Sequence, residues 1–341
     1  SLIPRRPQSL YHPLTISTSP TTWHGQHPWT VDNDIFRPFV VPEMGAKLVS
    51  LFDKRSQLEW LAGPGDRPFQ KVPYGADFVA QDMSGWDEMF PTIVACEYPA
   101  PGEYFGVTLP DHGEVWPLEW VFVPSEAGSL KFSVEGKALP YRLTRTLTYW
   151  AKDTLLMQYE LENLAAEWMP YMWSAHPQFA CGDLAELILP PRVSEVCNTL
   201  PSEWGWGEPE TRFDWPEALG VEGQRVRIDR IGPVSLNQAR KFFIPPKTPV
   251  GWAALIRQPK QDWLRLDWDP TRVPYLGIWI DEGVFNQESV AAIEPMTGYY
   301  DSLAVAWEKK RVNIIEAGAT QSWMLSVRLG TGDQQLFATV E

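Results

Sequence analysis

The sequence has few cysteines and few histidines, which limits the chemistry that it can support. Its 341 residues include three cysteines and five histidines. An odd number of widely spaced cysteines suits neither a disulfide framework nor a zinc site. Cys96, Cys181 and Cys197 are therefore expected to be small buried or half-buried thiols, which favours a cytoplasmic location. Because no histidines have a metal-ligand spacing such as His-x-x-x-His, neither a metal nor another cofactor is expected.

Positive charge and long apolar runs are also scarce. Lysine and arginine number 29 against 43 acidic residues, which gives a formal net charge of −14. Nucleic acids and anionic membranes select for a basic face, so neither is expected as a partner. The apolar runs are too short and too interrupted for a membrane-spanning helix. Residues 1–22 are rich in Pro, Ser and Thr and lack the apolar core of a signal peptide.

Fingerprints of nucleotide sites and of common hydrolases are missing as well. No glycine-rich dinucleotide or phosphate loop follows a predicted strand, and there is no Gly-x-Ser-x-Gly sequence. Long helical periodicity is also hard to find. The sequence has instead many short apolar or alternating runs, each bounded by Gly, Pro, Asp or Asn. This pattern predicts an all-β protein with many strands.

The strongest strand signal is a hairpin over residues 141–162, with its turn at Lys152-Asp153. Residues 200–218 carry three tryptophans among Pro, Gly and Glu, and we predict a long loop there. Further strands are predicted at residues 36–41, 47–53, 120–123, 130–134, 250–256, 264–268, 275–280, 290–294 and 322–329.

No change in composition marks a linker between domains. All-β sandwiches often reach this length as one unit. We therefore predict a single β-sandwich domain over residues 36–341, with residues 1–35 as an N-terminal arm packed on it.

Three segments each place a titratable side chain beside Pro or Gly and among aromatic residues. They are residues 109–116 with His112, residues 171–179 with His176, and residues 292–300 with Glu294. Glu294 ends an apolar strand, where a carboxylate needs either a partner or a function. Taken singly, each segment is weak evidence, but their order along the chain is more informative.

In this order, His112-Gly113, His176-Pro177 with Phe179, and Glu294-Pro295 resemble the galactose-mutarotase-like superfamily, which includes aldose 1-epimerases and hexose-6-phosphate epimerases. Residues 42–50 and 85–91 resemble an early strand and a glycine-containing loop of the same proteins. The similarity extends over residues 36–330. It implies an all-β fold, a large antiparallel β-sandwich (supersandwich), with a small-molecule carbohydrate as partner.

The resemblance also implies an activity, namely the interconversion of sugar anomers by opening and closing the hemiacetal ring. Glu294 is implied as the base at the anomeric hydroxyl, and His176 as the acid at the ring oxygen. Histidine is suited to move a proton in both directions near neutral pH. His112 is implied as a substrate-binding residue rather than a proton donor.

Side chains next to these segments are candidates for contacts with the sugar. Indole rings can stack on the C–H face of a sugar, and carboxylates can accept hydrogen bonds from its hydroxyls. The candidates are Trp86, Trp116, Trp173, Trp279, Asp87 and Asp281.

The sequence departs from its relatives in ways that bear on the sugar. Asp82-Met83-Ser84 stand before Gly85, where most relatives carry an arginine, and Glu114-Val115-Trp116 differ from the hexose-6-phosphate relatives. Residues 81–91, 109–120, 171–183 and 275–301 contain neither Lys nor Arg. Because a phosphate dianion usually needs such cations, an unphosphorylated sugar is expected. A distant cation in the pocket, such as Arg240, Lys241 or Arg257, would weaken that expectation.

Two other functions remain open on the same fold. One is a non-catalytic carbohydrate-binding protein, which would not need both His176 and Glu294. The other is a lyase or glycoside hydrolase, and hydrolysis normally uses two carboxylates that flank the bond. Asp87 or Asp281, opposite Glu294, could supply the second carboxylate. A monomer or homodimer is expected in each case.

Overall fold

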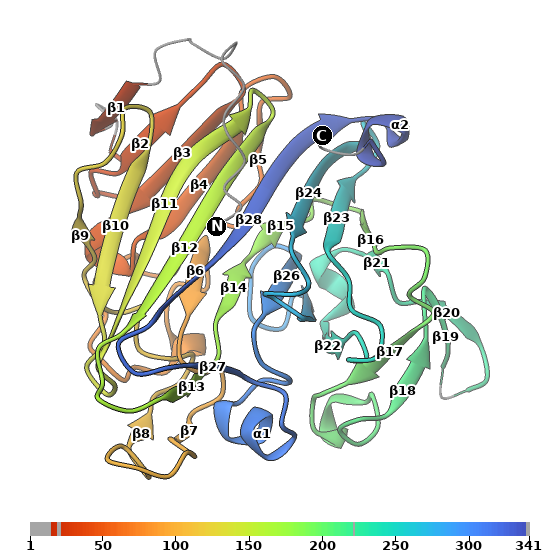
Figure 1. The fold of residues 1–341 in the computed structure, drawn as a ribbon. Helices are drawn as coiled ribbons and strands as arrows, with labels where there is room; N and C mark the ends of the chain where they lie inside the picture. Colours follow the sequence, from red (N-terminus) through yellow and green to blue (C-terminus); the bar gives the residue numbers. More distant parts are fainter. Residues whose placement is uncertain (1–14, 19–21, 221, 339–341) are drawn as a thin grey trace.

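The computed structural model describes residues 15–18, 22–220 and 222–338 of the chain. Strands dominate in these residues, and the helices are short (Figure 1). The two α-helices are α1 (Leu303–Glu308) and α2 (Asp333–Leu336), and the 3₁₀ turns are η1 (Pro42–Met44), η2 (Phe78–Ala80), η3 (Ser202–Trp204) and η4 (Val234–Leu236).

The first of two large sheets has thirteen strands and carries the candidate site. Its strand order is β1-β2-β3-β4-β6-β14-β26-β25-β22-β17-β18, with β5 paired to β4 and β15 paired to β26. The bounds are β1 (Thr15–Thr18), β2 (Trp29–Asp32), β3 (Phe36–Val41), β4 (Lys47–Asp53), β5 (Leu58–Glu59), β6 (Trp86–Met89), β14 (Ser174–Pro177), β15 (Phe179–Ala180), β17 (Glu195–Asn198), β18 (Arg212–Asp214), β22 (Gln238–Phe243), β25 (Tyr275–Glu282) and β26 (Val290–Met296).

The second sheet has nine strands, in the order β21-β16-β23-β24-β28-β12-β11-β10-β9. Its strands are β9 (Val121–Phe122), β10 (Leu130–Glu135), β11 (Tyr141–Ala151), β12 (Thr154–Asn163), β16 (Ala185–Ile188), β21 (Arg230–Ile231), β23 (Trp252–Arg257), β24 (Asp262–Trp268) and β28 (Thr320–Thr331). Three two-stranded ribbons complete the fold: β7 (Cys96–Glu97) with β8 (Thr108–Leu109), β13 (Met169–Tyr171) with β27 (Asn313–Ile315), and β19 (Glu217–Leu219) with β20 (Arg225–Arg227).

A hydrophobic core and a buried ion pair join the two sheets. Glu88 of β6 accepts hydrogen bonds from Arg145 of β11 at 3.0 Å and from Tyr159 of β12 at 2.7 Å. The inner face of the first sheet therefore carries Glu88. Because side chains alternate along a strand, Asp87 points to the opposite, outer face. The candidate site lies on this outer face.

The predicted fold class, a large antiparallel β-sandwich, is confirmed. All the strand pairs of the two large sheets are antiparallel (Figure 1). The predicted hairpin is β11 and β12; in β11, Leu143 and Leu147 are buried, while Arg142 and Thr146 on the other face are half-buried. The strands predicted at residues 36–41 and 47–53 are β3 and β4, with the predicted bounds.

The loop predicted over residues 200–218 is wrong in part. It contains η3 and the short edge strand β18, which pairs with β17. An ion pair of 2.6 Å between Arg212 and Glu195 holds this edge. Within the predicted arm, β1 and β2 extend the first sheet, while residues 1–14 and 19–21 lie outside the described residues. The domain boundary at residue 35 stays a prediction.

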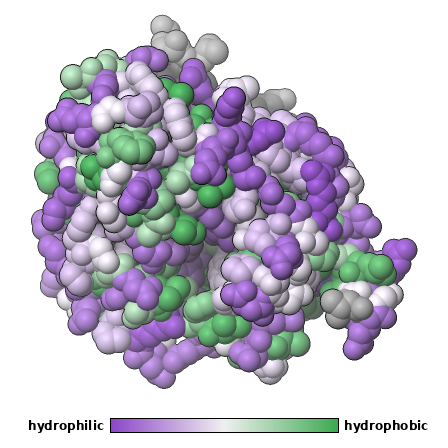
Figure 2. Space-filling view, turned by 90° about the horizontal axis from the view of Figure 1, so that it is seen from below, coloured by the Kyte–Doolittle hydropathy of each residue, from purple (hydrophilic) through white to green (hydrophobic). Residues whose placement is uncertain are grey.

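The face seen from below in Figure 1 is mixed in character. Hydrophobic residues are scattered there among hydrophilic ones rather than gathered in one broad patch (Figure 2). In the described part of the chain, no helix is both long enough and apolar enough to cross a membrane.

Candidate functional site

Neighbouring strands of the first sheet bring the two predicted catalytic side chains together. β14 lies between β6 and β26, and His176 on β14 is the direct cross-strand neighbour of Asp87 on β6. Glu294 lies on β26, which pairs with β25 on its other side. His176 Nε2 and Glu294 Oε1 are 3.6 Å apart. Two residues that are 118 positions apart in the sequence thus meet because their strands are adjacent.

Both side chains are buried, and both have polar atoms without partners. His176 is 5% exposed and Glu294 is 0% exposed. Neither His176 Nδ1 nor Glu294 Oε1 has a hydrogen-bond partner among the described residues. Buried polar atoms usually have partners, so each such atom needs an explanation. Glu294 Oε1 faces His176 Nε2, but at 3.6 Å the two atoms are too far apart for a good hydrogen bond.

Burial moves the pKa values of the two groups toward each other. It raises the pKa of the Glu294 carboxyl, although Lys241 opposes this shift. Burial also holds the pKa of His176 well below its usual range, helped by the positive potential of His112 and Lys241. Such perturbed, interacting groups titrate as a pair, and they are a common feature of sites that transfer protons.

Lys241 is a cation in the site that the local sequence signals did not include. Its ammonium group lies 2.9 Å from Glu294 Oε2 and 2.9 Å from Asp301 Oδ1. Burial opposes its charge, but Asp301 and Glu294 outweigh this effect and raise the pKa of Lys241. Lys241 lies on β22, two strands from Glu294, so it reaches across β25 to the carboxylate.

A second buried lysine lies on the other side of His176. Lys47 Nζ is 2.7 Å from Asp82 and 3.2 Å from Asp87. Burial raises the pKa of Asp87 to about 7 although Lys47 opposes the shift, whereas Lys47 overcomes burial at Asp82 and lowers the pKa of Asp82. Asp87 Oδ1 has no partner among the described residues, and Oδ2 has only the ion pair with Lys47. Asp87 therefore has acceptor capacity left for a ligand hydroxyl.

The raised pKa of Asp87 predicts a pH-dependent effect of the variant Asp87→Asn on stability. The folded protein binds a proton at Asp87 up to about pH 7, whereas the ordinary value is 3.8. Stability that depends on this proton is lost as pH rises toward 7. Each pKa unit is worth about 1.4 kcal/mol, so the stability of Asp87→Asn relative to the wild type should improve by about 3 kcal/mol between pH 5 and pH 8.

Urea unfolding at the two pH values measures this effect. Glu195→Gln is the control, because Lys247 and Arg212 lower the pKa of Glu195 and its contribution stays constant over that range. A stability difference between Asp87→Asn and the wild type that is the same at pH 5 and pH 8 would contradict the raised pKa.

His112 is held in a loop against His176. Its backbone has a φ of 58°, and its Nδ1 is 2.8 Å from Asp111 Oδ1. The imidazole ring stacks on Phe78 at 4.1 Å and meets the His176 ring edge-on at 5.5 Å. Trp116 supports the loop by donating from Nε1 to the Asp111 carbonyl at 3.1 Å. His112 and Trp116, which were each predicted to bind the substrate, are therefore both at the site. Trp116 supports the loop that carries His112.

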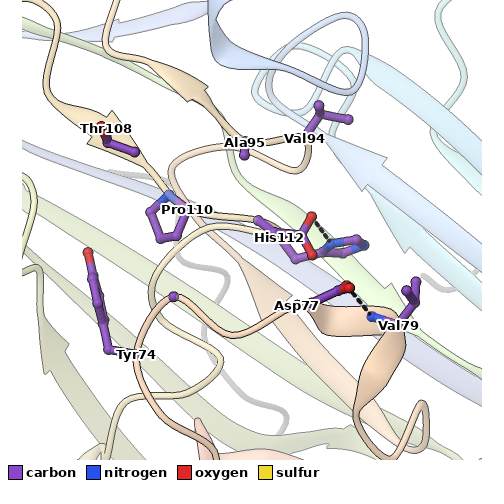
Figure 3. A pocket seen from close by; sticks show the side chains of 10 residues that line it. Tyr74, Asp77, Val79, Val94, Ala95, Thr108, Pro110 and His112 are labelled. Atoms are coloured by element: carbon purple, nitrogen blue, oxygen red, sulfur yellow. Dashed lines mark hydrogen bonds and ion pairs between the residues drawn. The ribbon is translucent and has the colours of Figure 1, made fainter.

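His112 also lines a surface pocket of about 760 Å³ (Figure 3). Its other walls include Tyr74, Asp77, Val94 and Asp111. In Figure 3 the hydrogen bond between His112 and its neighbour Asp111 is drawn as a dashed line at this pocket. The backbone N–H of Val94 donates to the Asp301 carbonyl at 2.6 Å, so one pocket wall is joined to the loop that carries Asp301.

The other tryptophans that were predicted to bind the sugar lie in different parts of the structure. Trp86 and Trp173 are fully buried in the hydrophobic core, and Trp173 donates to Glu88 on the inner face. Trp279 is half-buried on β25, in contact with Trp204 and Phe285.

The carboxylate of Asp281 is already occupied. It accepts backbone hydrogen bonds from Val284, Phe285 and Asn286, and so it caps the turn after β25. Trp86, Trp173 and Asp281 are thus not brought to the open atoms of His176 and Glu294.

Sequence reasoning missed three residues that shape the site, namely Lys241, Asp301 and Phe78. The sequence indicates Arg240 and Lys241 only as distant cations that could enter the pocket. In β22 these two residues are followed by Phe242 and Phe243, and five consecutive residues of the strand are buried. A run buried on both faces shows no alternation. Among the described residues, no group of three or more His, Cys, Asp or Glu side chains could hold a metal ion.

No protein-family model and no curated protein matches this sequence. Solved structures do match. A galactose mutarotase-like protein from Lactobacillus casei is 20% identical, with 88% of this chain and 99% of the other covered and a TM-score of 0.64. A galactose mutarotase-like protein from Clostridium acetobutylicum is 14% identical, with 94% and 99% covered and a TM-score of 0.65.

A protein from Escherichia coli described as a candidate aldose 1-epimerase is 17% identical, with 89% and 98% covered and a TM-score of 0.64. At such low identity a structural match establishes the fold, and activity must be argued from the site. These matches and the two antiparallel sheets confirm the predicted resemblance at the level of architecture: the chain has the galactose mutarotase-like fold.

Proposed function

We propose that this protein is an aldose 1-epimerase-like enzyme that interconverts the anomers of an unphosphorylated sugar. The observation that carries the proposal is the facing pair of His176 Nε2 and Glu294 Oε1 at 3.6 Å. The two sugar oxygens that must exchange protons, O1 and the ring oxygen O5, are bonded to the same carbon. An acid and a base that act on them must therefore lie close together, as these two groups do.

Ring opening needs two proton transfers, one from the sugar to Glu294 and one from His176 to the sugar. Glu294 takes the proton of the O1 hydroxyl, the C1–O5 bond breaks to leave an aldehyde at C1, and O5 receives a proton from His176. Rotation about C1–C2 followed by the reverse transfers gives the other anomer. The pair carries one proton before and after opening. Burial raises the pKa of Glu294 and lowers that of His176, so it favours the transfer of the proton to Glu294 and its release from His176.

Neighbouring groups are available to hold the sugar. Asp87 Oδ1 has no partner among the described residues and lies on the strand next to His176, and His112 lies against the His176 ring. Trp279 on β25 is half-buried and offers an indole face. We propose that Asp87, His112 and Trp279 bind the sugar, and that Trp116 acts through the His112 loop.

The direct test follows the optical rotation of freshly dissolved aldoses with and without the purified protein. Catalysis predicts faster approach to the equilibrium rotation for at least one sugar. Binding without catalysis would leave the rate unchanged and would favour a carbohydrate-binding protein instead. Release of an aglycone or of a new sugar end would favour a hydrolase or lyase, with Asp87 rather than the occupied Asp281 as its second carboxylate.

The site's charges favour a neutral sugar over a sugar phosphate. Both buried cations are already bound by two carboxylates each: Lys241 by Glu294 and Asp301, and Lys47 by Asp82 and Asp87. Neither lysine is therefore free to neutralise a dianion, which the surrounding carboxylates repel at reduced dielectric. We expect kcat/KM for a 6-phosphorylated hexose to be at least about tenfold below that for the free hexose.

Matched pairs of free and 6-phosphorylated hexoses measure this preference. The 6-O-methyl hexose is the control, because it adds bulk at the same position without charge. A higher kcat/KM for the phosphorylated member of any pair would contradict the proposal.

A further inference from the structure

Glu294 has two oxygens in different environments. Oε2 receives a charged hydrogen bond from Lys241 at 2.9 Å, whereas Oε1 has no hydrogen-bond partner among the described residues and faces His176. The carboxylate is completely buried. An isolated buried carboxylate would take up a proton and lose its ability to act as a base.

Lys241 is itself held from a second direction. Asp301 lies 2.9 Å from the same ammonium group, and its backbone carbonyl accepts hydrogen bonds from Ile93 and Val94. Asp301 is thus anchored to a different segment from the strand that carries Glu294. The three side chains form a chain of charges in the order Asp301, Lys241, Glu294, with the cation in the middle.

We propose that Lys241 is a positioning residue that acts through Glu294: it fixes Oε2, favours the ionised form of the carboxylate, and leaves Oε1 as the atom that takes the proton. This proposal rests on the function proposed above. Asp301 limits the effect of the lysine, because its negative charge offsets part of the attraction that Lys241 exerts on Glu294. Lys241 does not touch the reacting atoms in this arrangement.

Other charged groups around Glu294 are accounted for. His176 faces it from β14, and His112 faces His176 from the loop that follows β8. Lys47 lies beyond His176, where it is bound by Asp82 and Asp87. Apart from His176, Lys241 is the cationic side chain among the described residues that makes an ion pair with Glu294. Removing it should therefore affect Glu294 more than any other single substitution of a cation.

Removing Lys241 or Asp301 should shift the titration of Glu294 in opposite directions. Lys241→Met removes the attraction that keeps Glu294 ionised, so the carboxyl should protonate at higher pH. Asp301→Asn removes the opposing negative charge, so the carboxyl should protonate at lower pH. A shift of one pH unit changes the ratio of ionised to protonated carboxyl tenfold. We expect shifts of about this size or larger.

Carbon-13 NMR of the Glu294 carboxyl measures both shifts without requiring activity. The pH profile of kcat/KM gives the second readout. Its acidic limb should move to higher pH for Lys241→Met, with activity partly restored at high pH, and to lower pH for Asp301→Asn. Lys241→Arg keeps the charge and should keep the limb near its wild-type position. Lys54→Met is the control, because Lys54 pairs with Asp32 away from the site.

The outcomes separate this proposal from the proposed function. Opposite shifts of the Glu294 titration support the role of Lys241 even if no sugar is turned over. Unchanged titration in both folded variants, or shifts in the same direction, would overturn it. If Lys241→Met does not fold, Asp301→Asn alone decides, since the absence of a downward shift contradicts the proposal. Absence of wild-type turnover would instead count against the proposed function.

Discussion

Glu294→Gln should reduce the rate of anomer exchange by about 10²–10⁴-fold, because the amide cannot accept the proton of the anomeric hydroxyl. The side chain is nearly the same size, so the packing around β26 should be kept. Lys241 can still donate to the amide oxygen in the place of Oε2. The loss should therefore be in kcat, measured as the rate of exchange on saturating sugar, with a folded protein by circular dichroism.

His176→Asn should cause a loss of the same order, since it removes the group that gives a proton to the ring oxygen. Combining the two substitutions should cost little more than either alone, because groups that act as a unit are not additive. Glu316→Gln, at an exposed position, is the control for a Glu-to-Gln change. Exchange rates near those of the wild type in both folded site variants would show that the acid–base assignment is wrong.

Arg145→Met should destabilise the fold by about 3–5 kcal/mol, because it leaves a buried carboxylate without its counter-charge. The side chains of Arg145 and Glu88 are both 0% exposed, and Arg145 Nη1 donates to Glu88 at 3.0 Å. Arg145 also donates to the carbonyl of Ala46, next to β4. Glu88 would keep only neutral donors, from Tyr159 and Trp173.

Urea unfolding of single and double variants tests this prediction. The double variant Arg145→Met with Glu88→Gln should recover part of the loss, because the unpaired charge is then gone. Arg142 is the matched control on the same strand: its ion pairs with Glu135 and Glu162 are exposed, so Arg142→Met should cost less than about 1 kcal/mol. A similar small cost for Arg145→Met would show that the buried pair contributes little.

Local sequence patterns predicted the strands that have one buried face. In β11 every second residue from Tyr141 to Tyr149 is buried, and the half-buried Arg142 and Thr146 lie on the other face. This matches the period of a strand, and the turn at Lys152-Asp153 sets the register. β22 and β6 escaped prediction because they are buried on both faces and carry charged residues. Their charges are neutralised by partners from distant strands, and a local pattern does not reveal such partners.

The same limit applies to the candidate site. The flanking Pro and Gly residues singled out His112, His176 and Glu294, and the structure brings these three segments to one place. Sequence proximity was a poor guide to the tryptophans. Trp86 immediately precedes Asp87, but successive side chains point to opposite faces of a sheet, so Trp86 enters the core.

Long-range partners explain the remaining differences. Asp281 lies near the end of β25, yet its carboxylate is used by the backbone of the following turn. Lys241 reaches the site because β22 pairs with β25, which pairs with β26. This strand order follows from the whole sheet, so no local signal in residues 238–243 predicts that the lysine meets Glu294.

Magnetisation-exchange NMR on a panel of aldoses at anomeric equilibrium is the most direct test of the proposed activity. The measurement reports transfer between the two anomeric C1–H signals while the composition stays constant, so it detects interconversion and not hydrolysis or binding. We predict that catalytic amounts of wild-type protein increase the exchange rate of at least one unphosphorylated aldose, and that Glu294→Gln removes the increase. Exchange at the uncatalysed rate for every aldose, with protein that is folded, would contradict the proposal that this site interconverts sugar anomers.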